Sequence, residues 1–365
     1  MAGNSRFIAL LGKQIKTPIV LSSMAGVTDA AYVVERAEHA GVAFIGGYSI
    51  DEAARNASKE IEACGRKEFE ASFEDIATEL AMLEDCGIIP GLNLRGASKE
   101  AFLEAAGVFG KDIIYEIDAH CRQTPMVAAG CGEALLKDTE RLCDIVSALA
   151  EAGCTVSVKT RAGIADDRAL AKALWKAGAK IIHVDLMDFG ASKLRQIRNS
   201  CPLVIIANNG VDSPDTMMEY FSHGADLVSL ARHADPAVLT LLDRYIRAIA
   251  DEVGWYNAPK QLCRGGDYRS LAFCCMPIKQ CALLPTLNAI GLEYGAYTQL
   301  KEEAVAGTPL AEGSHTCFGS LAFCCKSSTP CMFRDMTLKS IKLPKNEYMA
   351  LKRKLSEEIM DEIFR

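Results

Sequence analysis

Eight cysteines gather in the last third of the chain, and thiolates at this density are typical of metal binding. The hexapeptide Ser-Leu-Ala-Phe-Cys-Cys occurs at 270–275 and again at 320–325, and each copy has one further cysteine before it and one after it. The two quartets are Cys263, Cys274, Cys275 and Cys281, and then Cys317, Cys324, Cys325 and Cys331. Four thiolates are the ligand number of a structural zinc ion or of a four-iron cluster. The repeat therefore predicts a metal-binding module.

The spacing of these cysteines favours iron–sulfur chemistry over zinc. Zinc knuckles and ferredoxin loops use Cys-x-x-Cys, a spacing that occurs nowhere in this chain. Adjacent cysteines in extended chain point to opposite faces, so one pair can serve two clusters or bridge within a larger one. We expect two 4Fe-4S clusters, one per copy. The alternatives are one larger cluster shared by both copies, zinc, or a structural or thiol-redox role.

The composition is that of a large globular protein from a reducing compartment. The chain has 365 residues, of which 50% are apolar and 24% charged, so a sizeable core can form. We find no apolar run long enough for a membrane span and no signal-peptide pattern. A cytoplasmic location without a membrane partner is therefore expected. The net charge of −7 argues against broad, nonspecific nucleic-acid binding.

Short apolar runs alternate with amphipathic stretches over residues 17–232, as in a parallel α/β protein. The runs expected to form strands are 17–22, 43–47, 88–94, 113–118, 155–159, 180–185, 202–207 and 226–230. Eight such units predict a closed (β/α)8 TIM barrel, and an open doubly wound sheet is the alternative. The predicted domains are the barrel at 1–257, a Cys-rich metal-binding domain with an internal repeat at 258–336, and an amphipathic C-terminal helix at 337–365.

Polar residues follow each apolar run, and the carboxyl ends of barrel strands carry the chemistry of such folds. Asn209, Gly210 and Arg232 follow the last two runs. Glycine lets an anion approach backbone N–H groups and arginine adds a bidentate fork, so we expect a phosphate group to bind here. Arg95 and Arg161 either clamp an anionic substrate or pair with nearby carboxylates.

Taken in order, several strand ends resemble the tRNA-dihydrouridine synthase family of FMN-binding TIM barrels, over roughly residues 17–247. Segment 24–29 (MAGVTD) resembles the family's first-strand motif, with Ser23 where proline is usual, and segment 156–163 (VSVKTRAG) resembles the strand with the flavin-contacting lysine. The resemblance implies FMN binding by Ser23, Met24, Ala25, Asn93, Lys159, Asp185, Asn209, Gly210, Ala231 and Arg232.

The same resemblance implies a catalytic acid in the loop after the fourth strand. The family's Asn-x-Gly-Cys-Pro loop corresponds here to 118–125 (DAHCRQTP), so Cys121 is the candidate acid and His120 stands beside it. Such an acid protonates a carbon of the substrate from one face, while the flavin delivers a hydride to the opposite face of the substrate. Asp185 takes the place of a histidine of the family.

After the barrel, that family has a basic helical domain that binds tRNA, and in this chain the Cys-rich segment takes the place of that domain. A dihydrouridine-synthase-like barrel followed by CRGGDYRSLAFCC resembles the methanogenesis marker protein 9 family, which implies a methane-producing archaeon and supplies no reaction. The basic residues that would replace the missing domain are Lys339, Lys342, Lys345, Lys352, Arg353 and Lys354.

We therefore expect a flavin-dependent oxidoreductase in which C-terminal iron–sulfur clusters feed electrons to FMN. The resemblance implies uridine in tRNA as the substrate, while the electron donor stays unnamed. The alternative is of another class, namely a non-flavin iron–sulfur accessory or assembly protein that partners a methanogenic enzyme.

Overall fold

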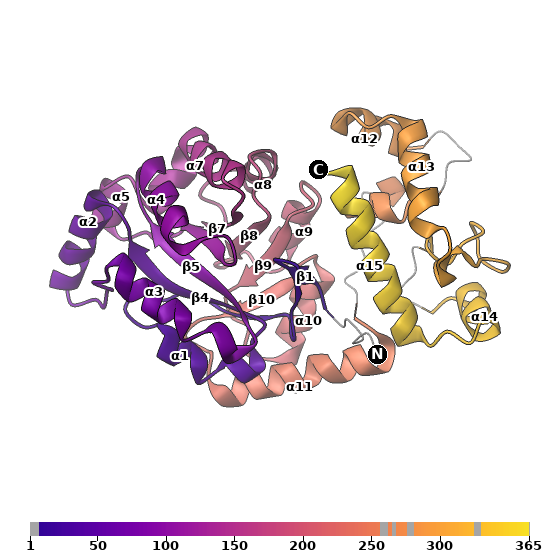
Figure 1. Ribbon diagram of the computed structural model, residues 1–365, viewed down its shortest axis with the longest axis horizontal. Coiled ribbons are helices and arrows are strands. Elements are labelled where there is room, and N and C mark those ends of the chain that lie inside the picture. The colour runs from indigo at the N-terminus through magenta and orange to yellow at the C-terminus, as the bar shows by residue number, and fades with distance from the viewer. Residues whose placement is uncertain (1–6, 256–261, 265–267, 276–280, 325–329, 365) are drawn as a thin grey trace. The chain divides into compact units, whose positions relative to one another are not determined.

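A computed structural model of the chain describes residues 7–255, 262–264, 268–275, 281–324 and 330–364 (Figure 1). The chain divides into two compact units, Ile8–Ile246 and a second formed by Met1–Phe7 with Arg247–Arg365. The division falls inside helix α11 (Pro236–Val253), whereas the sequence predicts it after residue 257. The expected C-terminal helix belongs to the same unit as the Cys-rich segment.

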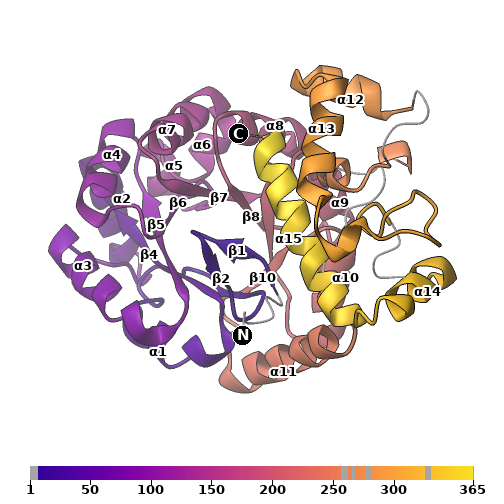
Figure 2. The same cartoon turned by 45° about the vertical axis from the view of Figure 1, so that its right-hand side comes forward.

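The larger unit is a closed barrel of eight parallel strands (Figure 2). The strands are β3 (Ile19–Leu21), β4 (Val42–Ser49), β5 (Ile89–Arg95), β6 (Ile114–Asp118), β7 (Thr155–Arg161), β8 (Ile181–Asp185), β9 (Val204–Asn208) and β10 (Leu227–Leu230). They pair in chain order, and β10 closes the barrel on β3. The TIM barrel is confirmed and the doubly wound alternative is wrong. Each of the eight expected apolar runs coincides with one strand.

Helices surround this barrel and begin at side-chain caps that the sequence encodes. They are α1 (Ala30–Val34), α2 (Glu52–Ala63), α3 (Phe73–Ala81), α4 (Lys99–Phe109), α5 (Thr124–Ala128), α6 (Glu133–Lys137), α7 (Thr139–Glu151), α8 (Asp167–Lys176), α9 (Ser192–Arg198), α10 (Pro214–Ser222) and α11. Asp51, Ser72 and Ser98 cap α2, α3 and α4 by accepting a backbone N–H of the first turn. Each such cap stabilises its helix by about 1 kcal/mol.

A hairpin of β1 (Ala9–Leu10) and β2 (Lys13–Gln14) covers the amino end of the barrel, a feature that the sequence did not lead us to expect (Figure 2). Leu10 of β1 and Ile15, which follows β2, are both buried. Gly41, just before β4, passes so close that a Cβ there would lie 2.1 Å from the carbonyl oxygen of Thr17. With this end closed, the carboxyl ends of the strands are left as the barrel's open face.

The smaller unit contains α12 (Leu283–Ile290), α13 (Tyr294–Val305), α14 (Met332–Ser340) and α15 (Lys345–Ile363). One pair of helices follows each cysteine quartet, and α13 packs against α15. Phe273, Phe323, Tyr348, Leu355 and Ile359 share one buried apolar cluster. The repeat is therefore larger than its cysteine motif. Among the described helices, none has both the length and the apolarity required to cross a bilayer.

Candidate functional site

A layer of buried polar side chains fills the middle of the barrel. The strand register aligns Asn93 with Glu116 and Glu116 with Ser157. The Glu116 carboxylate accepts from Asn93 Nδ2 at 2.9 Å and from Ser157 Oγ at 3.1 Å, and it lies 2.8 Å from His183 Nδ1. The other ring nitrogen of His183 lies 2.7 Å from Ser229 Oγ. Each member of this layer has a polar partner. The layer therefore stabilises the barrel interior and also forms the inner boundary of the site at the carboxyl ends of the strands.

Lys159 lies two residues after Ser157 on β7, nearer the carboxyl ends of the strands, and its side chain is buried. Its Nζ donates to Ser22 Oγ at 2.9 Å, to Ser23 Oγ at 3.1 Å and to the Ser23 carbonyl at 3.2 Å. In register beside it is Asp118. Burial raises the pKa of Asp118, but hydrogen bonding to His120 and the charges of His120, Arg95 and Lys159 outweigh burial and hold that pKa well below its usual range.

His120 lies between two carboxylates at the same rim. Its Nδ1 is 3.6 Å from Asp118 Oδ1 and its Nε2 is 3.3 Å from Asp185 Oδ2. Its side chain remains 28% exposed, so the imidazole is open to solvent and to a ligand. Burial raises the pKa of Asp185, while the hydrogen bond to His120 lowers it, and the net shift is downward. The structure thus brings together two residues that the sequence singled out separately.

The Cys121 thiol has a different environment. Cys121 is buried in an apolar cluster with Ala54 and Ala57 of α2 and with Met126. Its backbone N–H donates to Asp118 Oδ1 at 3.0 Å, and burial raises the pKa of its thiol. The thiol is therefore held protonated and is packed under α2.

Arg95 and Arg161 are both engaged in ion pairs. Arg95 contacts Asp118 at 3.2 Å and Glu68 at 2.5 Å, and Arg161 contacts Glu133 at 2.8 Å. The pairing alternative therefore holds for both arginines, with two glutamates as partners that the sequence did not suggest.

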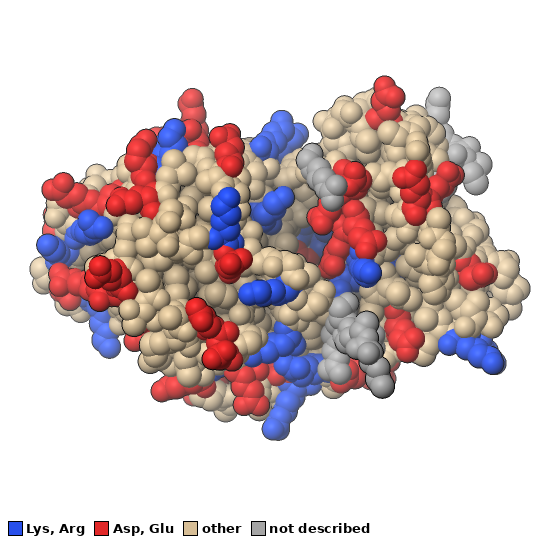
Figure 3. Space-filling view, viewed as in Figure 1, with Lys and Arg blue, Asp and Glu red and all other residues tan. Residues whose placement is uncertain are grey.

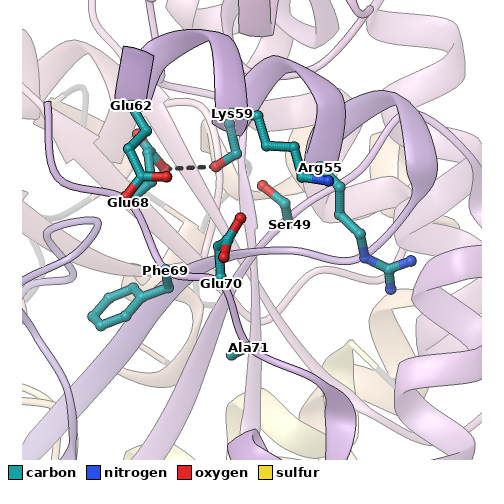
Figure 4. Close-up of a pocket in the computed structure, with 9 residues that line it drawn as sticks. Ser49, Arg55, Lys59, Glu62, Glu68, Phe69, Glu70 and Ala71 are labelled. Carbon is teal, nitrogen blue, oxygen red and sulfur yellow. Dashed lines mark hydrogen bonds between the residues drawn. The ribbon is translucent and has the colours of Figure 1, made fainter. Parts of the chain in front are cut away.

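Glu68 also lines a cavity of about 220 Å³ beside the end of β4 (Figure 4). Its lining residues are Ser49, Arg55, Ser58, Lys59, Glu62, Glu68, Phe69, Glu70 and Ala71. Ser58 Oγ donates to Glu68 at 2.9 Å, the contact dashed in Figure 4. Glu68 also pairs with Arg95, which in turn contacts Asp118 at the barrel mouth.

The ends of β9 and β10 are open. Gly210 has φ +70° and is exposed, and a Cβ at this position would meet nothing within 4 Å. Arg232 is also exposed, and Ala231 is half-buried. Asn209 turns its side chain back to donate to the Met187 carbonyl at 3.0 Å. Open backbone beside an exposed arginine is what an anionic group requires.

The remaining residues expected at a cofactor lie on β5 and in the turn after β3. Asn93 is fully buried, with Nδ2 committed to Glu116 and Oδ1 lacking a hydrogen-bond partner. Ser23 is bound by Lys159, and the N–H of Met24 donates to Thr28 Oγ1 at 3.0 Å, which fixes the turn that includes Ala25.

In the smaller unit, Cys263 and Cys281 of the first quartet are exposed, and Cys274 and Cys275 are half-buried. Burial, together with the nearby thiols of Cys275 and Cys263, raises the pKa of Cys274 to about 11. Burial raises the pKa of Tyr297, and Cys274, Cys275 and Cys281 raise it further. Burial is the largest cause of both shifts, and metal binding at Cys274 would require its thiol to lose the proton.

The second quartet is described in part. Cys317 is exposed, Cys324 and Cys331 are half-buried, and Cys325 lies outside the described residues. Within the described ranges, no three His, Cys, Asp or Glu side chains converge closely enough to hold a single ion. A four-iron cluster holds its four cysteine sulfurs farther apart than a single ion does.

Two residue pairs that the sequence interpretation missed lie beside these cysteines. Tyr297 and Lys301 on α13, and Tyr348 and Lys352 on α15, occur in the same pattern, Tyr-x-x-Leu-Lys. Extending the comparison of the two copies past the cysteines would have found them. Lys352 and Arg353 are buried, so the expectation that they contribute to a basic surface is wrong.

The fold and the comparisons agree on the class of protein. A family model described as dihydrouridine synthase matches residues 92–253, which run from β5 to α11 and include Lys159, Gly210 and Arg232. Together with the closed parallel barrel, this match shows that the larger unit is a TIM barrel with a region similar to the dihydrouridine synthases.

Two relatives come from Methanocaldococcus jannaschii. The uncharacterized protein MJ0115 is 46% identical over 108 residues, which are 30% of this chain and 70% of that protein. The chain belongs to the same family as this relative. The uncharacterized protein MJ0144 is 27% identical over 228 residues, covering 59% of this chain and 88% of that protein. Neither relative carries the methanogenesis marker name, so that membership stays a prediction.

Among solved structures, a FabK (M276A) mutant from Thermotoga maritima aligns with 14% sequence identity and a TM-score of 0.41. The alignment covers 60% of this chain and 63% of that one, so the chain spans less than two thirds of the FabK structure. The fold assignment rests on the strand order.

Proposed function

We propose that the chain is a flavin-dependent oxidoreductase of the dihydrouridine synthase type. One arrangement carries the proposal, namely a buried cation, Lys159, and a carboxylate-held imidazole, His120, on either side of Asp118 at the barrel mouth. A cation at a flavin's ring edge stabilises its anionic reduced form, and an imidazole within reach of a substrate transfers protons.

The residues present fit an FMN. Gly210 and Arg232 offer the open, cationic end that a phosphate requires, and Asn93 Oδ1 is a buried acceptor without a donor. Lys159 would hold the ring edge, assisted by the Ser23 hydroxyl that it already binds. When bound, the flavin supplies hydride transfer.

His120 fits the role of proton donor better than Cys121 does. Its ring is partly exposed and its Nε2 lies 3.3 Å from Asp185 Oδ2, whereas the Cys121 thiol packs against α2. The lowered pKa values of both aspartates keep them anionic, so the His120 ring lies between two negatively charged groups.

Electrons would reach the flavin from iron–sulfur clusters in the smaller unit. The repeated spacing of the two cysteine quartets supports two clusters. All four cysteines of the first quartet are among the described residues, whereas Cys325 of the second lies outside them.

We propose uridine in an RNA as the substrate, with a tRNA as the macromolecular partner. Acidic and basic side chains are interspersed over the face drawn in Figure 3, and no broad basic surface gathers there among the described residues. RNA binding would therefore rest on local contacts near the mouth.

An anaerobic preparation tests the proposal. The visible spectrum should show the two absorption peaks of bound flavin above a broad iron–sulfur shoulder, and reduced flavin should be reoxidised by unmodified tRNA transcript. His120→Gln should slow this reoxidation by about 10²–10⁴-fold with flavin content unchanged. Cys121→Ala should alter it little, and the reverse ranking would assign the acid to Cys121.

A second function is favoured by one observation. Lys159 has three oxygen acceptors within the protein and Glu116 is fully partnered, so both side chains have partners without a flavin. An accessory or assembly protein that carries clusters to a methanogenic enzyme would have this property. Iron near eight atoms per chain without flavin would establish this alternative.

A further inference from the structure

The cavity beside the end of β4 has a buried polar floor and a charged rim (Figure 4). Ser49, the last residue of β4, and Ser58 of α2 are buried, whereas Lys59 and Glu70 are exposed. Glu68 also lies on the floor, with its side chain 5% exposed. The cavity is therefore open to solvent at a charged edge and closed by hydroxyl and carboxylate groups at its base.

Two consecutive segments of the chain build this cavity. Four of its lining residues are spaced three or four positions apart on α2, so they share one face of that helix. They are Arg55, Ser58, Lys59 and Glu62. Segment 68–71, which follows α2, supplies further lining residues. This segment is fixed in place, because a Cβ at Gly26 would lie only 2.5 Å from Lys67 Cβ and because the ring centroid of Phe69 lies 5.1 Å from that of Tyr48.

The Ser49 hydroxyl is the feature of this cavity that points to a ligand. Ser49 is only 7% exposed, and its Oγ has no hydrogen-bond partner among the described residues. A buried hydroxyl normally has a partner, because leaving its hydrogen-bonding capacity unused is costly. Since Ser49 lines the cavity, the partner of its hydroxyl would be a group that enters the cavity.

The charged groups around the cavity are balanced in sign. Glu68 is paired with Arg95. The remaining charged lining residues are two cations and two anions, namely Arg55, Lys59, Glu62 and Glu70. Arg55 donates to the Ile50 carbonyl at 3.0 Å, whereas Lys59 and Glu70 have neither a hydrogen-bond nor an ion-pair partner within the described part of the chain. One ammonium and one carboxylate are thus available to a ligand.

This balance of charge selects among classes of ligand. A polyanion would be repelled by Glu62 and Glu70, and a polycation would be repelled by Arg55 and Lys59. A molecule with one carboxylate and one ammonium matches both signs. The volume of about 220 Å³ is below the roughly 300–1,000 Å³ of sites that enclose drug-sized ligands, so the ligand is about the size of an amino acid.

We propose that this cavity binds a small zwitterion, a molecule of amino-acid size with one carboxylate and one ammonium group. In the view of Figure 4, Ser49 lies between Lys59 and Glu70. The carboxylate of the ligand pairs with Lys59 and accepts from the Ser49 hydroxyl, and its ammonium pairs with Glu70. This site is additional to the proposed flavin site, and its occupation requires neither flavin nor iron.

Isothermal titration calorimetry of the full-length protein tests the proposal. The zwitterionic probes are glycine, β-alanine and 4-aminobutyrate, in which the two charges are progressively farther apart, and the single-charge analogues are propionate and propylamine. The variants are Ser49→Ala, Lys59→Met and Glu70→Gln. Glu60→Gln is the matched control, because Glu60 is an exposed residue of α2 that does not line the cavity. The melting temperature of each variant is measured as a check on folding.

The expected result is saturable binding of at least one zwitterion, with affinity about 10-fold or more above that of propionate and propylamine. Lys59→Met and Glu70→Gln should each weaken this binding roughly 10-fold, and Ser49→Ala should weaken it by about 2- to 10-fold. Glu60→Gln should leave it unchanged.

Three outcomes would overturn the inference. If none of the three zwitterions binds saturably, the partner of the Ser49 hydroxyl is solvent alone. If propionate or propylamine binds as tightly as the zwitterions, the class of ligand is wrong. If binding is the same in the parent and in the Ser49, Lys59 and Glu70 variants, the zwitterion binds elsewhere on the protein.

Discussion

His120 Nε2 lies 3.3 Å from Asp185 Oδ2, although His120 follows β6 and Asp185 ends β8, and these strands are not neighbours in the barrel. The loop after β6 therefore extends across the end of β7 to reach β8. Arg161, at the end of that intervening strand, donates to the His120 carbonyl at 3.2 Å. These contacts link the ends of β6, β7 and β8 at the mouth of the barrel. The carboxylates of Asp118 and Asp185 should therefore dominate the change in stability of this region at acid pH.

The barrel should lose stability as the pH falls below about 4. Asp118 and Asp185 have pKa values held below the unfolded value of about 3.9, so their stabilisation is complete above that value and is lost as they protonate below it. Urea unfolding from pH 7 to pH 3 should show a smaller decline for Asp118→Asn than for the parent. The exposed Asp188→Asn is the control and should follow the parent.

Removal of the Glu116 carboxylate should cost about 3–5 kcal/mol of unfolding free energy, because it leaves buried donors on Asn93, Ser157 and His183 without their acceptor. Glu116→Ala compared with the exposed Glu104→Ala in chemical denaturation measures this loss. A cost within about 0.5 kcal/mol of the control would show that the polar layer does not stabilise the barrel.

Arg232→Gln should weaken FMN binding by roughly 10- to 100-fold, the value of a charge-assisted hydrogen bond to phosphate. Fluorescence titration of the flavin-free protein gives the affinity. Because Arg232 is exposed, the fold should be unaffected. Arg244→Gln, an exposed arginine of α11, is the control, and equal affinities in the two variants would place the phosphate elsewhere.

Cys281→Ser should remove about half of the bound iron if each quartet holds its own cluster. Cys64→Ser, an exposed cysteine of the barrel, should remove none. Iron and acid-labile sulfide per chain are the measurements. Loss of all iron from Cys281→Ser would point to a single cluster shared between the copies.

The barrel was predictable because its strands are apolar on both faces and recur in a regular order. The mouth was only partly predictable. Lys159, His120 and Asp185 could be placed at strand ends, but their mutual distances depend on register and on how far each loop reaches. Glu68 illustrates the limit, since it lies in a loop with no distinctive pattern and meets Arg95 only in the folded chain.

The N-terminal hairpin and the extent of the repeat escaped prediction for different reasons. The hairpin strands have two residues each, too few to show a period. The second half of the repeat retains only its tyrosine, leucine and lysine, and the spacing from Cys324 to Tyr348 is one residue longer than that from Cys274 to Tyr297. Buried lysines are also uncommon enough that sequence alone assigns them to the surface.

The paired helices of the smaller unit have an evolutionary consequence. Phe273 of one copy and Phe323 of the other lie in the same apolar cluster. Lys301 contacts the ring of Phe323, and Lys352 contacts that of Phe273. Half of this unit would expose that surface, so an ancestral single-copy peptide would have required a twin to fold. Duplication within one gene would then have converted a homodimer into a single chain, freeing its two halves to diverge.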